Sequence, residues 1–286
     1  MIGEKPKGLR VHLPVAYPAL MLAVFFIIPF GIMVAVSFFH REPGGFYLPG
    51  FEFTNYQNLY TALFRRTLLF SLFIAGLSAA VCVSIGFPFT YFITRMRRRA
   101  QVVWLVFLMS VLSLSEVIVG FAWSLLLSRT AGLSNLLVWF GLMEKPVAWY
   151  PGFTALLLGI CYLAFPYTVL VLYPPLSRLD PALPEAAQTL GASPIRTFFS
   201  VVVGSLRNAI VASFVMVFVF SLGVYLLPQI LGRPKQWTLS VLITDQAIYQ
   251  TNMPMAASMA IFFMLVSLLL VMLTMVIGKG KNLKKG

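Results

Sequence analysis

One acidic residue stands inside a long apolar run, beside residues that give it a possible binding role. Glu116 lies in LMSVLSLSEVIVGFAW, and the surrounding run has no other Asp, Glu, Lys or Arg. A charge at the centre of a bilayer costs about 2.5–3.5 kcal/mol, so this carboxyl group is expected to face protein or a water-filled cavity. At helical spacing Ser113 and Trp123 share its face, and an aromatic ring attracts ammonium groups. The pattern predicts a path for a cation; the alternative is a protonated or hydrogen-bonded Glu116 that only joins helices.

Two further residues are candidates for the same path. Asp245 lies in SVLITDQAIYQTN, where it either flanks a gate or caps a short helix. Tyr225 and Pro228 come late in another apolar run, and a proline there frees a backbone carbonyl and permits bending. Tyr225 is therefore a candidate gate residue, and a tolerated kink is the alternative interpretation of the proline.

The remaining polar residues do not support enzyme chemistry. His12 and His40 flank the first apolar run at opposite ends, and the sequence contains no G-x-S-x-G, no H-E-x-x-H and no pair of carboxylates within apolar runs. Cys82 and Cys161 lie inside apolar runs, where free thiols behave as small hydrophobic groups. A phosphate-binding G-x-x-x-x-G-K-[ST] loop is also missing. We expect no catalytic residue, no metal site and no cofactor bound by this chain.

The composition indicates that these residues belong to a membrane protein. Of the 286 residues, 60% are hydrophobic and 10% charged, whereas about a quarter of the residues in soluble domains are charged. A helix needs about 20 apolar residues to cross the hydrocarbon, and lipid allows only helices or closed barrels. Six runs reach that length: Leu13–Phe39, Thr67–Ile93, Val102–Leu127, Phe153–Leu176, Ala209–Leu227 and Met255–Ile277. The sequence predicts an all-α polytopic protein with six transmembrane helices.

The basic residues predict how these helices are oriented. The net charge is +13, and the 21 Lys and Arg residues divide fourteen to seven between loops on alternate sides of the predicted spans. Cytoplasmic loops carry the excess of basic residues, so both termini are expected in the cytoplasm. Anionic lipid, and not nucleic acid, is then the expected partner of the basic surface. The first run is too long for the hydrophobic region of a secretory signal, so no cleaved leader is expected.

A proline-punctuated polar segment, residues 179–206, separates the fourth and fifth runs. In LDPALPEAAQTLG, Asp180 is a suitable N-cap, and Glu185 lies in the first turn, where the helix dipole favours an anion. Gly191 is expected to end this helix in a left-handed conformation. Ser193 and Pro194 then begin a second helix that leads into the fifth run. A connector between spans needs only a few residues, so this longer segment predicts a contact with another protein; a plain connector on the membrane surface is the alternative.

The segment EAAQTLGASPIRTFFSVVVGSL resembles the EAA loop of binding-protein-dependent ABC transporter permeases. Glu185, Ala186, Ala187 and Gly191 match the family pattern residue by residue. The family's later proline falls at Gly204, which leaves the entry into the fifth helix less constrained. Other stretches, among them PFTYFITRMRRR and LPQILGRPKQWTLSVLITDQAIYQTNMPMAAS, are similar to permeases of the spermidine/putrescine type across nearly the whole chain.

This resemblance implies a fold, a set of partners and roles for residues. It implies the MetI-like permease fold in a single transmembrane domain, with an N-terminal helix and outer loop at 1–66, a five-helix core at 67–278 and a coupling segment at 179–206. The coupling residues would be Glu185, Ala186, Ala187, Gly191 and Ser193. They would dock on a cytoplasmic ATPase that holds ATP and Mg. A second permease subunit, two ATPase subunits and an external binding protein, which Asp245 is placed to meet, would complete an importer in the bacterial inner membrane.

The sequence is compatible with more than one transported solute and more than one energy source. Glu116 and Trp123 favour a polyamine-like cation, whereas similar permeases import other small solutes, such as an amino-acid derivative, an organophosphonate or a metal ion. The alternative class is a secondary transporter or channel that is driven by an ion gradient and needs no ATPase. The second permease is expected to be a different chain, and a pair of identical chains is the alternative.

Overall fold

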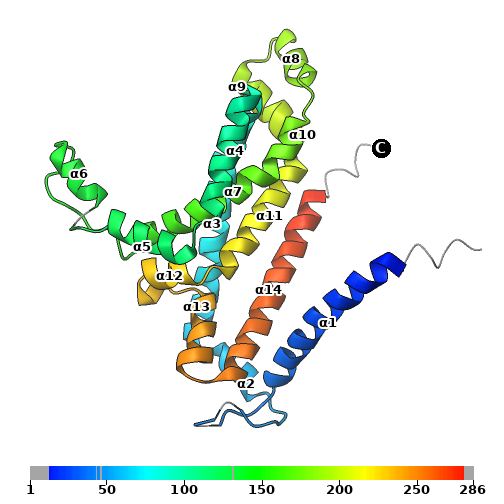
Figure 1. The fold of residues 1–286 in the computed structure, drawn as a ribbon, viewed down its shortest axis with the longest axis vertical. Coiled ribbons are helices and arrows are strands. Elements are labelled where there is room, and N and C mark those ends of the chain that lie inside the picture. Colours follow the sequence, from blue (N-terminus) through cyan, green and yellow to red (C-terminus); the bar gives the residue numbers. More distant parts are fainter. Residues whose placement is uncertain (1–12, 43, 46, 131, 280–286) are drawn as a thin grey trace, which may run out of the picture. The chain divides into compact units, whose positions relative to one another are not determined.

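The computed structural model describes residues 13–279 except Pro43, Phe46 and Ala131, and these residues form helices joined by loops (Figure 1). The α-helices are α1 (Leu13–Val36), α2 (Thr54–Gln57), α3 (Ala62–Arg95), α4 (Arg98–Leu112), α5 (Glu116–Leu126), α6 (Leu133–Trp139), α7 (Phe153–Ser177), α8 (Ala182–Thr189), α9 (Pro194–Thr197), α10 (Val203–Ser205), α11 (Arg207–Gly223), α12 (Leu226–Leu231), α13 (Leu239–Thr244) and α14 (Met253–Lys279). Single 3-10 turns lie at Asn58–Tyr60 and Pro234–Gln236, and single π-helical turns at Phe198–Val202 and Asp245–Tyr249. The β-pairing in the described part of the chain is one isolated bridge, between His40 and Leu48. The prediction of an all-α protein is confirmed for these residues.

Four of the six predicted spans are continuous helices. Helices α1, α3, α7 and α14 are long and apolar enough to cross a membrane, and the number rises to six if each of two bent helix pairs counts as one span. The six-helix count and the orientation of the spans stay predictions. Both termini, residues 1–12 and 280–286, lie outside the described residues.

The prediction of a continuous third helix was wrong. Helices α4 and α5 meet at an angle of 96°. Ser115 takes an extended conformation, and its hydroxyl accepts a hydrogen bond from the Val117 amide, so it caps α5. A serine that satisfies a free amide at a helix start stabilises a new N-terminus in place of continued helix.

The predicted fifth helix also differs from the structure. Residues Pro194–Ser205 and helix α11 meet at an angle of 73°. Helix α11 ends at Gly223, four residues before the predicted end at Leu227, because Val224 is extended. The chain then turns into the separate short helix α12.

The chain divides into two compact units, Met1–Thr61 with Ile243–Phe262, and Ala62–Leu242 with Phe263–Gly286. The predicted division at residues 66 and 67 stays a prediction.

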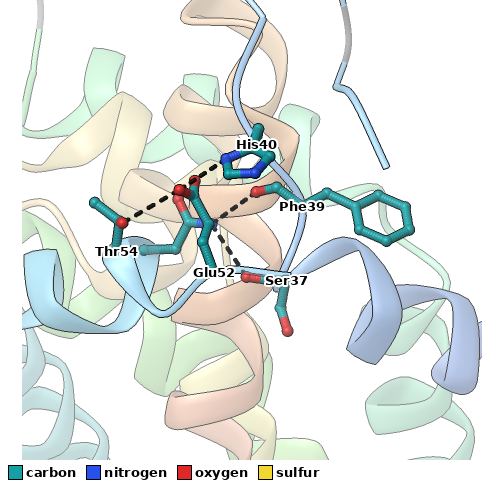
Figure 2. Close-up of polar contacts among 6 residues, drawn as sticks. Ser37, Phe39, His40, Glu52 and Thr54 are labelled. Atoms are coloured by element: carbon teal, nitrogen blue, oxygen red, sulfur yellow. Dashed lines mark hydrogen bonds and ion pairs between the residues drawn. The ribbon is translucent and has the colours of Figure 1, made fainter. Parts of the chain in front are cut away.

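In the first unit, polar contacts order the loop that follows α1 (Figure 2). The Asn55 amide donates to the carbonyl oxygens of Ser37, at 3.1 Å, and Phe39, at 3.0 Å. His40 pairs with Glu52 at 2.7 Å from Nδ1 to Oε2, and the Thr54 hydroxyl donates to the same Glu52 oxygen. These contacts hold the two ends of the loop together.

The second unit is built around helices α3, α7 and α11. Their buried side chains include Ile74 of α3, Leu156 and Ile160 of α7 and Val217 of α11. A Cβ at Gly86 of α3 would lie only 2.7 Å from Cγ2 of Thr168, so α3 and α7 approach closely there. Tight packing of this kind uses small residues, as is usual where lipid supplies no hydrophobic driving force between helices.

Both cysteines lie at the contact between α3 and α7. Cys82 is buried, Cys161 is half-buried, and both are free thiols. The Cys82 thiol donates to the Cys161 carbonyl at 3.6 Å. The prediction that they lie among hydrophobic side chains is confirmed by the surrounding cluster, which contains Ala79, Ala164 and Val217.

Candidate functional site

The polar segment 179–206 begins with helix α8, whose start is capped as the sequence predicts. The Ala182 amide donates to Asp180 Oδ1 at 2.9 Å, so Asp180 satisfies one of the free amides at the N-terminus. Glu185 is exposed in the first turn, where the helix dipole favours its charge. Ala186 is exposed and Ala187 half-buried, so a second protein can approach this turn closely.

Helix α8 ends at Gly191 in a Schellman motif. The Gly191 amide donates to the Gln188 carbonyl at 2.9 Å, and the Ala192 amide donates to the Ala187 carbonyl at 3.0 Å. Gly191 has φ +89°, a left-handed conformation that residues with a Cβ rarely adopt. The predicted role of this glycine as the helix end is confirmed.

The second half of the segment starts as predicted but does not continue as one regular helix. The Ser193 hydroxyl accepts from the Arg196 amide at 3.3 Å and caps α9. A π-helical turn then runs from Phe198 to Val202, and α10 ends before the 73° bend into α11. The predicted second helix is therefore present, with a π-helical turn inside it and a bend before the fifth run. Gly204 lies in α10, and a Cβ there would meet no atom within 4 Å.

Aromatic side chains fasten this half of the segment to α3. The ring of Phe198 contacts those of Phe87, at 5.7 Å between centroids, and Tyr91, at 5.4 Å. The guanidinium group of Arg95 lies over the Tyr91 ring, with its Cζ 5.1 Å from the centroid. The segment is thus held on α3 at Phe198, and α8 lies beyond this attachment (Figure 1).

The segment also exposes large apolar side chains. Leu190 is 88% exposed and Phe199 66% exposed, and Leu183 and Ile195 are also exposed. A groove of about 730 Å³ runs between the segment and α3, lined by residues that include Phe92, Ile195 and Phe199. Large exposed apolar side chains gathered in one segment typically mark a contact with another protein or with lipid.

Glu116, the acidic residue of the predicted path, does not lie in the middle of a helix. It is the first residue of α5, and its Oε1 accepts a hydrogen bond from the Leu227 amide, at the start of α12, over 2.9 Å. Ser113 lies in the break before α5, where its hydroxyl donates to the Met109 carbonyl. The predicted shared helical face of Ser113 and Glu116 is therefore wrong, because the helix is interrupted between them.

Trp123 and Tyr225 lie near the two ends of the α5–α12 contact. Trp123 is two turns along α5 from Glu116, and its ring meets that of Tyr162 of α7 edge to face, with centroids 5.9 Å apart. Tyr225 directly precedes α12 and accepts from the Gln229 amide through its carbonyl. Glu116 and Tyr225 thus lie at the start of α12, and Trp123 lies two turns further along α5, against α7.

Asp245 lies in the first unit, where it holds a turn. Its Oδ2 accepts from the Gln250 side-chain amide at 2.8 Å, and the Gln250 carbonyl accepts from Arg41 at 2.9 Å. This agrees with the interpretation of Asp245 as a residue that ends a short helix. Among the described residues, no three His, Cys, Asp or Glu side chains come together as metal ligands.

Three contributors to the α5–α12 region did not emerge from the sequence pattern: the Leu227 amide, Tyr162, and Gly159, which lets α12 approach α7. A backbone amide leaves no signal in a pattern of residue types. Tyr162 and Gly159 lie in a run whose apolar residues show no preferred helical face, so the sequence does not single them out. One signal was available, since Ser115 followed by Glu116 is typical of a helix N-terminus.

Known proteins resemble this chain in sequence and in fold. Residues 83–280 match the family model described as "Binding-protein-dependent transport system inner membrane component". The spermidine/putrescine transport system permease protein PotB of Escherichia coli is 26% identical over 240 residues, covering 84% of this chain and 87% of PotB. The ferric transport system permease protein FbpB of Actinobacillus pleuropneumoniae is 27% identical over 168 residues, covering 58% of this chain and 24% of FbpB.

Solved structures of a bacterial ABC transporter that imports the acidic polysaccharide alginate share the fold. One chain superposes with a TM-score of 0.75 at 18% identity, covering 94% of both chains. A second, in complex with a periplasmic protein bound to an alginate pentasaccharide, gives a TM-score of 0.72 at 17% identity, covering 92% of both chains. These structures show the fold. The family match over residues 83–280 and the similarity to PotB show that the chain belongs to the binding-protein-dependent transport system inner membrane components and is a permease subunit of an ABC transporter, not an enzyme.

Proposed function

We propose that this chain is one of two membrane subunits of an ATP-driven importer, and that segment 179–206 transmits the motion of a cytoplasmic ATPase to the membrane helices. The proposal rests on the way the segment is attached: α8 and Gly191 are exposed, while the Phe198 ring packs on α3. We call the turn at Gly191, between α8 and α9, the corner. If the corner is rigid, exposed on one side and anchored to α3 on the other, a displacement of the corner is passed on to α3.

The coupling residues are Glu185, Ala186, Ala187, Gly191 and Ser193. Capping by Asp180 and Ser193 and the Schellman motif at Gly191 make the corner stiff, since each device satisfies backbone groups that otherwise bind water. The exposed side chains of Leu183 and Leu190 supply apolar area for docking. ATP and Mg belong to the ATPase subunits, because the chain contains no phosphate-binding loop.

The proposed complex contains a second permease, two ATPase subunits and an external binding protein. The solved alginate importer in complex with its periplasmic protein supports the last of these. The charge distribution supports a location in the bacterial inner membrane with both termini and α8 on the cytoplasmic side. A second permease that differs from this chain is favoured by the similarity to polyamine permeases.

The solute proposed is a small cation of the polyamine type. The similarity to PotB supports it. The ferric permease and the alginate importer among the similar proteins keep a metal ion and other solutes, such as an amino-acid derivative or an organophosphonate, as alternatives. In such an assembly the external binding protein sets most of the selectivity.

Co-purification tests the proposed class. The tagged chain is expressed with the genes that neighbour its own, extracted in mild detergent and reconstituted in liposomes. We expect an ATPase subunit to co-purify, and ATP hydrolysis to increase when the binding protein loaded with spermidine is added. Uptake by liposomes that contain this chain alone, driven by an ion gradient, would contradict the proposal and support a secondary transporter.

A further inference from the structure

Two broken helices meet at one hydrogen bond in the second unit. Helix α4 ends at Leu112 and α5 begins at Glu116; α11 ends at Gly223 and α12 begins at Leu226. The bond between the Glu116 carboxyl group and the Leu227 amide joins the start of α5 to the start of α12, at 2.9 Å. It pairs a free helix amide with a half-buried carboxylate oxygen, and leaving either group without a partner costs free energy where water is scarce.

Helix α12 fits against α5 with little clearance. A Cβ at Gly120, one turn along α5 from Glu116, would lie 2.9 Å from Ile230 Cδ1, 3.6 Å from Ile230 Cβ and 3.4 Å from Leu227 Cδ2. The absence of a side chain at Gly120 is thus what lets α12 lie beside α5. Helices α5 and α12 therefore pack in close van der Waals contact, and the Leu227 amide also donates a hydrogen bond to Glu116.

The other end of α12 is held by α7. The Gly152 amide, at the start of α7, donates to the Leu231 carbonyl at 2.9 Å, and Arg233 Nε donates to the Pro151 carbonyl at 2.9 Å. A Cβ at Gly159 of α7 would lie 2.5 Å from Leu231 Cδ1. The C-terminal end of α12 is therefore fixed by backbone hydrogen bonds and close packing. Its N-terminal end is held by the packing of the buried Leu227 side chain and by one hydrogen bond to a side chain, that of Glu116.

We propose that Glu116 is a positioning residue, whose carboxyl group holds the N-terminal end of α12 against α5, and that this contact opens and closes during transport. The inference rests on the proposed function, and it assigns the carboxyl group to a backbone amide where the sequence suggested a cationic solute. Val224 and Tyr225, which lie outside both helices, provide the non-helical residues about which α12 can turn. A single side-chain hydrogen bond can be exchanged in each cycle, whereas a continuous helix cannot easily be broken.

The close approach of Gly120 and Ile230 offers a direct test by disulfide formation. Cysteines at both positions have a Cβ separation near 3.6 Å, within the range of about 3.5–4.5 Å for disulfides, and the Ile230→Cys change removes the atom that crowds Gly120. The native thiols are first replaced by Cys82→Ala and Cys161→Ala. The control pair is Gly86→Cys with Thr168→Cys, which joins two continuous helices at a Cβ separation of 3.4 Å.

The first measurement is the rate of copper-phenanthroline cross-linking without nucleotide. It compares the 120/230 cysteine pair with Glu116 retained, with Glu116→Gln and with Glu116→Ala. Glutamine keeps the accepting oxygen, so we expect a rate within twofold of that with glutamate. Alanine loses it, and we expect at least a fivefold slower rate. Equal rates with alanine and glutamate, or an equal slowing of the 86/168 control by Glu116→Ala, overturn the positioning role.

The second measurement uses the complex with its ATPase subunits, trapped with ATP and vanadate. We expect the 120/230 rate to fall at least fivefold relative to the nucleotide-free complex, and the 86/168 rate to stay unchanged. An unchanged 120/230 rate overturns the opening of the contact. If no ATPase co-purifies, the proposed function fails, and the first measurement still decides whether Glu116 positions α12.

Discussion

The ring of Phe198 meets the ring of Tyr91 edge to face, with 5.4 Å between the centroids. The two residues lie far apart in the sequence, one in the polar segment and one on α3, and their contact ties the exposed corner at Gly191 to the membrane helices. Aromatic pairs in this geometry contribute about 0.5–1.5 kcal/mol beyond the area they bury.

Removing the Phe198 ring should loosen the segment without removing its docking surface. Phe198 is only half-buried, so we expect Phe198→Ala to destabilise the protein by at most about 3 kcal/mol, the lower end for buried phenylalanine. We expect the complex to retain ATP hydrolysis and to lose solute uptake, because the segment would no longer pass its displacement to α3. The control is Phe199→Ala, whose ring is 66% exposed; its thermal midpoint should be close to wild type. A midpoint lowered equally by both changes would contradict the difference in packing.

Gly191 and Gly141 form a matched pair for testing the coupling corner. Gly141 ends α6 in the same motif as Gly191, with φ +73° and its own pair of amide–carbonyl bonds. A Cβ at either position meets no atom within 4 Å. A left-handed conformation costs a residue with a Cβ roughly 1–2 kcal/mol, so Gly191→Val and Gly141→Val should destabilise the protein similarly.

Only the change at Gly191 should affect coupling. We expect Gly191→Val to abolish stimulation of the ATPase and uptake while the protein still reaches the membrane, and Gly141→Val to retain both. Membrane yield, ATPase stimulation and spermidine uptake are measured in parallel. Normal uptake with Gly191→Val would remove the coupling role of the corner.

Charge reversal at Glu185 should uncouple transport with little effect on folding. A basic residue in the first turn of α8 loses a favourable dipole interaction of about 0.3–1 kcal/mol. We therefore expect Glu185→Lys to keep its membrane yield and to lose co-purification with the ATPase. Glu144→Lys, at another exposed acidic position, is the control and should retain it. Equal binding of the ATPase by both variants would argue against a contact at Glu185.

Alanine substitutions at two glycines test the clearance around α12. At Gly159 a methyl group would lie 2.5 Å from Leu231 Cδ1, whereas at Gly76 of α3 it meets no atom within 4 Å. Overpacking a buried site costs typically about 1–3 kcal/mol, so Gly159→Ala should lower the thermal midpoint. Gly76→Ala should leave it unchanged or raise it slightly, because alanine is about 0.5–1 kcal/mol better than glycine within a helix. Scanning fluorescence on detergent-solubilised protein measures the thermal midpoints of the two variants. Equal midpoints would contradict the tight fit at Gly159 and mean that Leu231 can move aside.

Much of the fold follows from local patterns that a sequence displays directly. The apolar runs predict α1, α3, α7 and α14, because lipid leaves a long apolar segment little choice but a helix. The two ends of α8 are equally predictable, since Asp180 and Gly191 act on backbone groups within a few residues of themselves. The role of Ser115 was readable in the same way, as an N-cap followed by an acid, although apolar length alone suggested an uninterrupted span.

The sequence by itself therefore determined a helical membrane protein with a capped, glycine-ended corner between two spans, because those features depend on near neighbours and on composition. Only the tertiary structure decided that α11 stops at Gly223, what Glu116 binds and how the corner is attached. Glu116 and Leu227 are 111 positions apart, and the group that meets the carboxyl is a backbone amide, which every residue except proline carries. Such a contact exists only once helices have packed, so no spacing of residue types can reveal it.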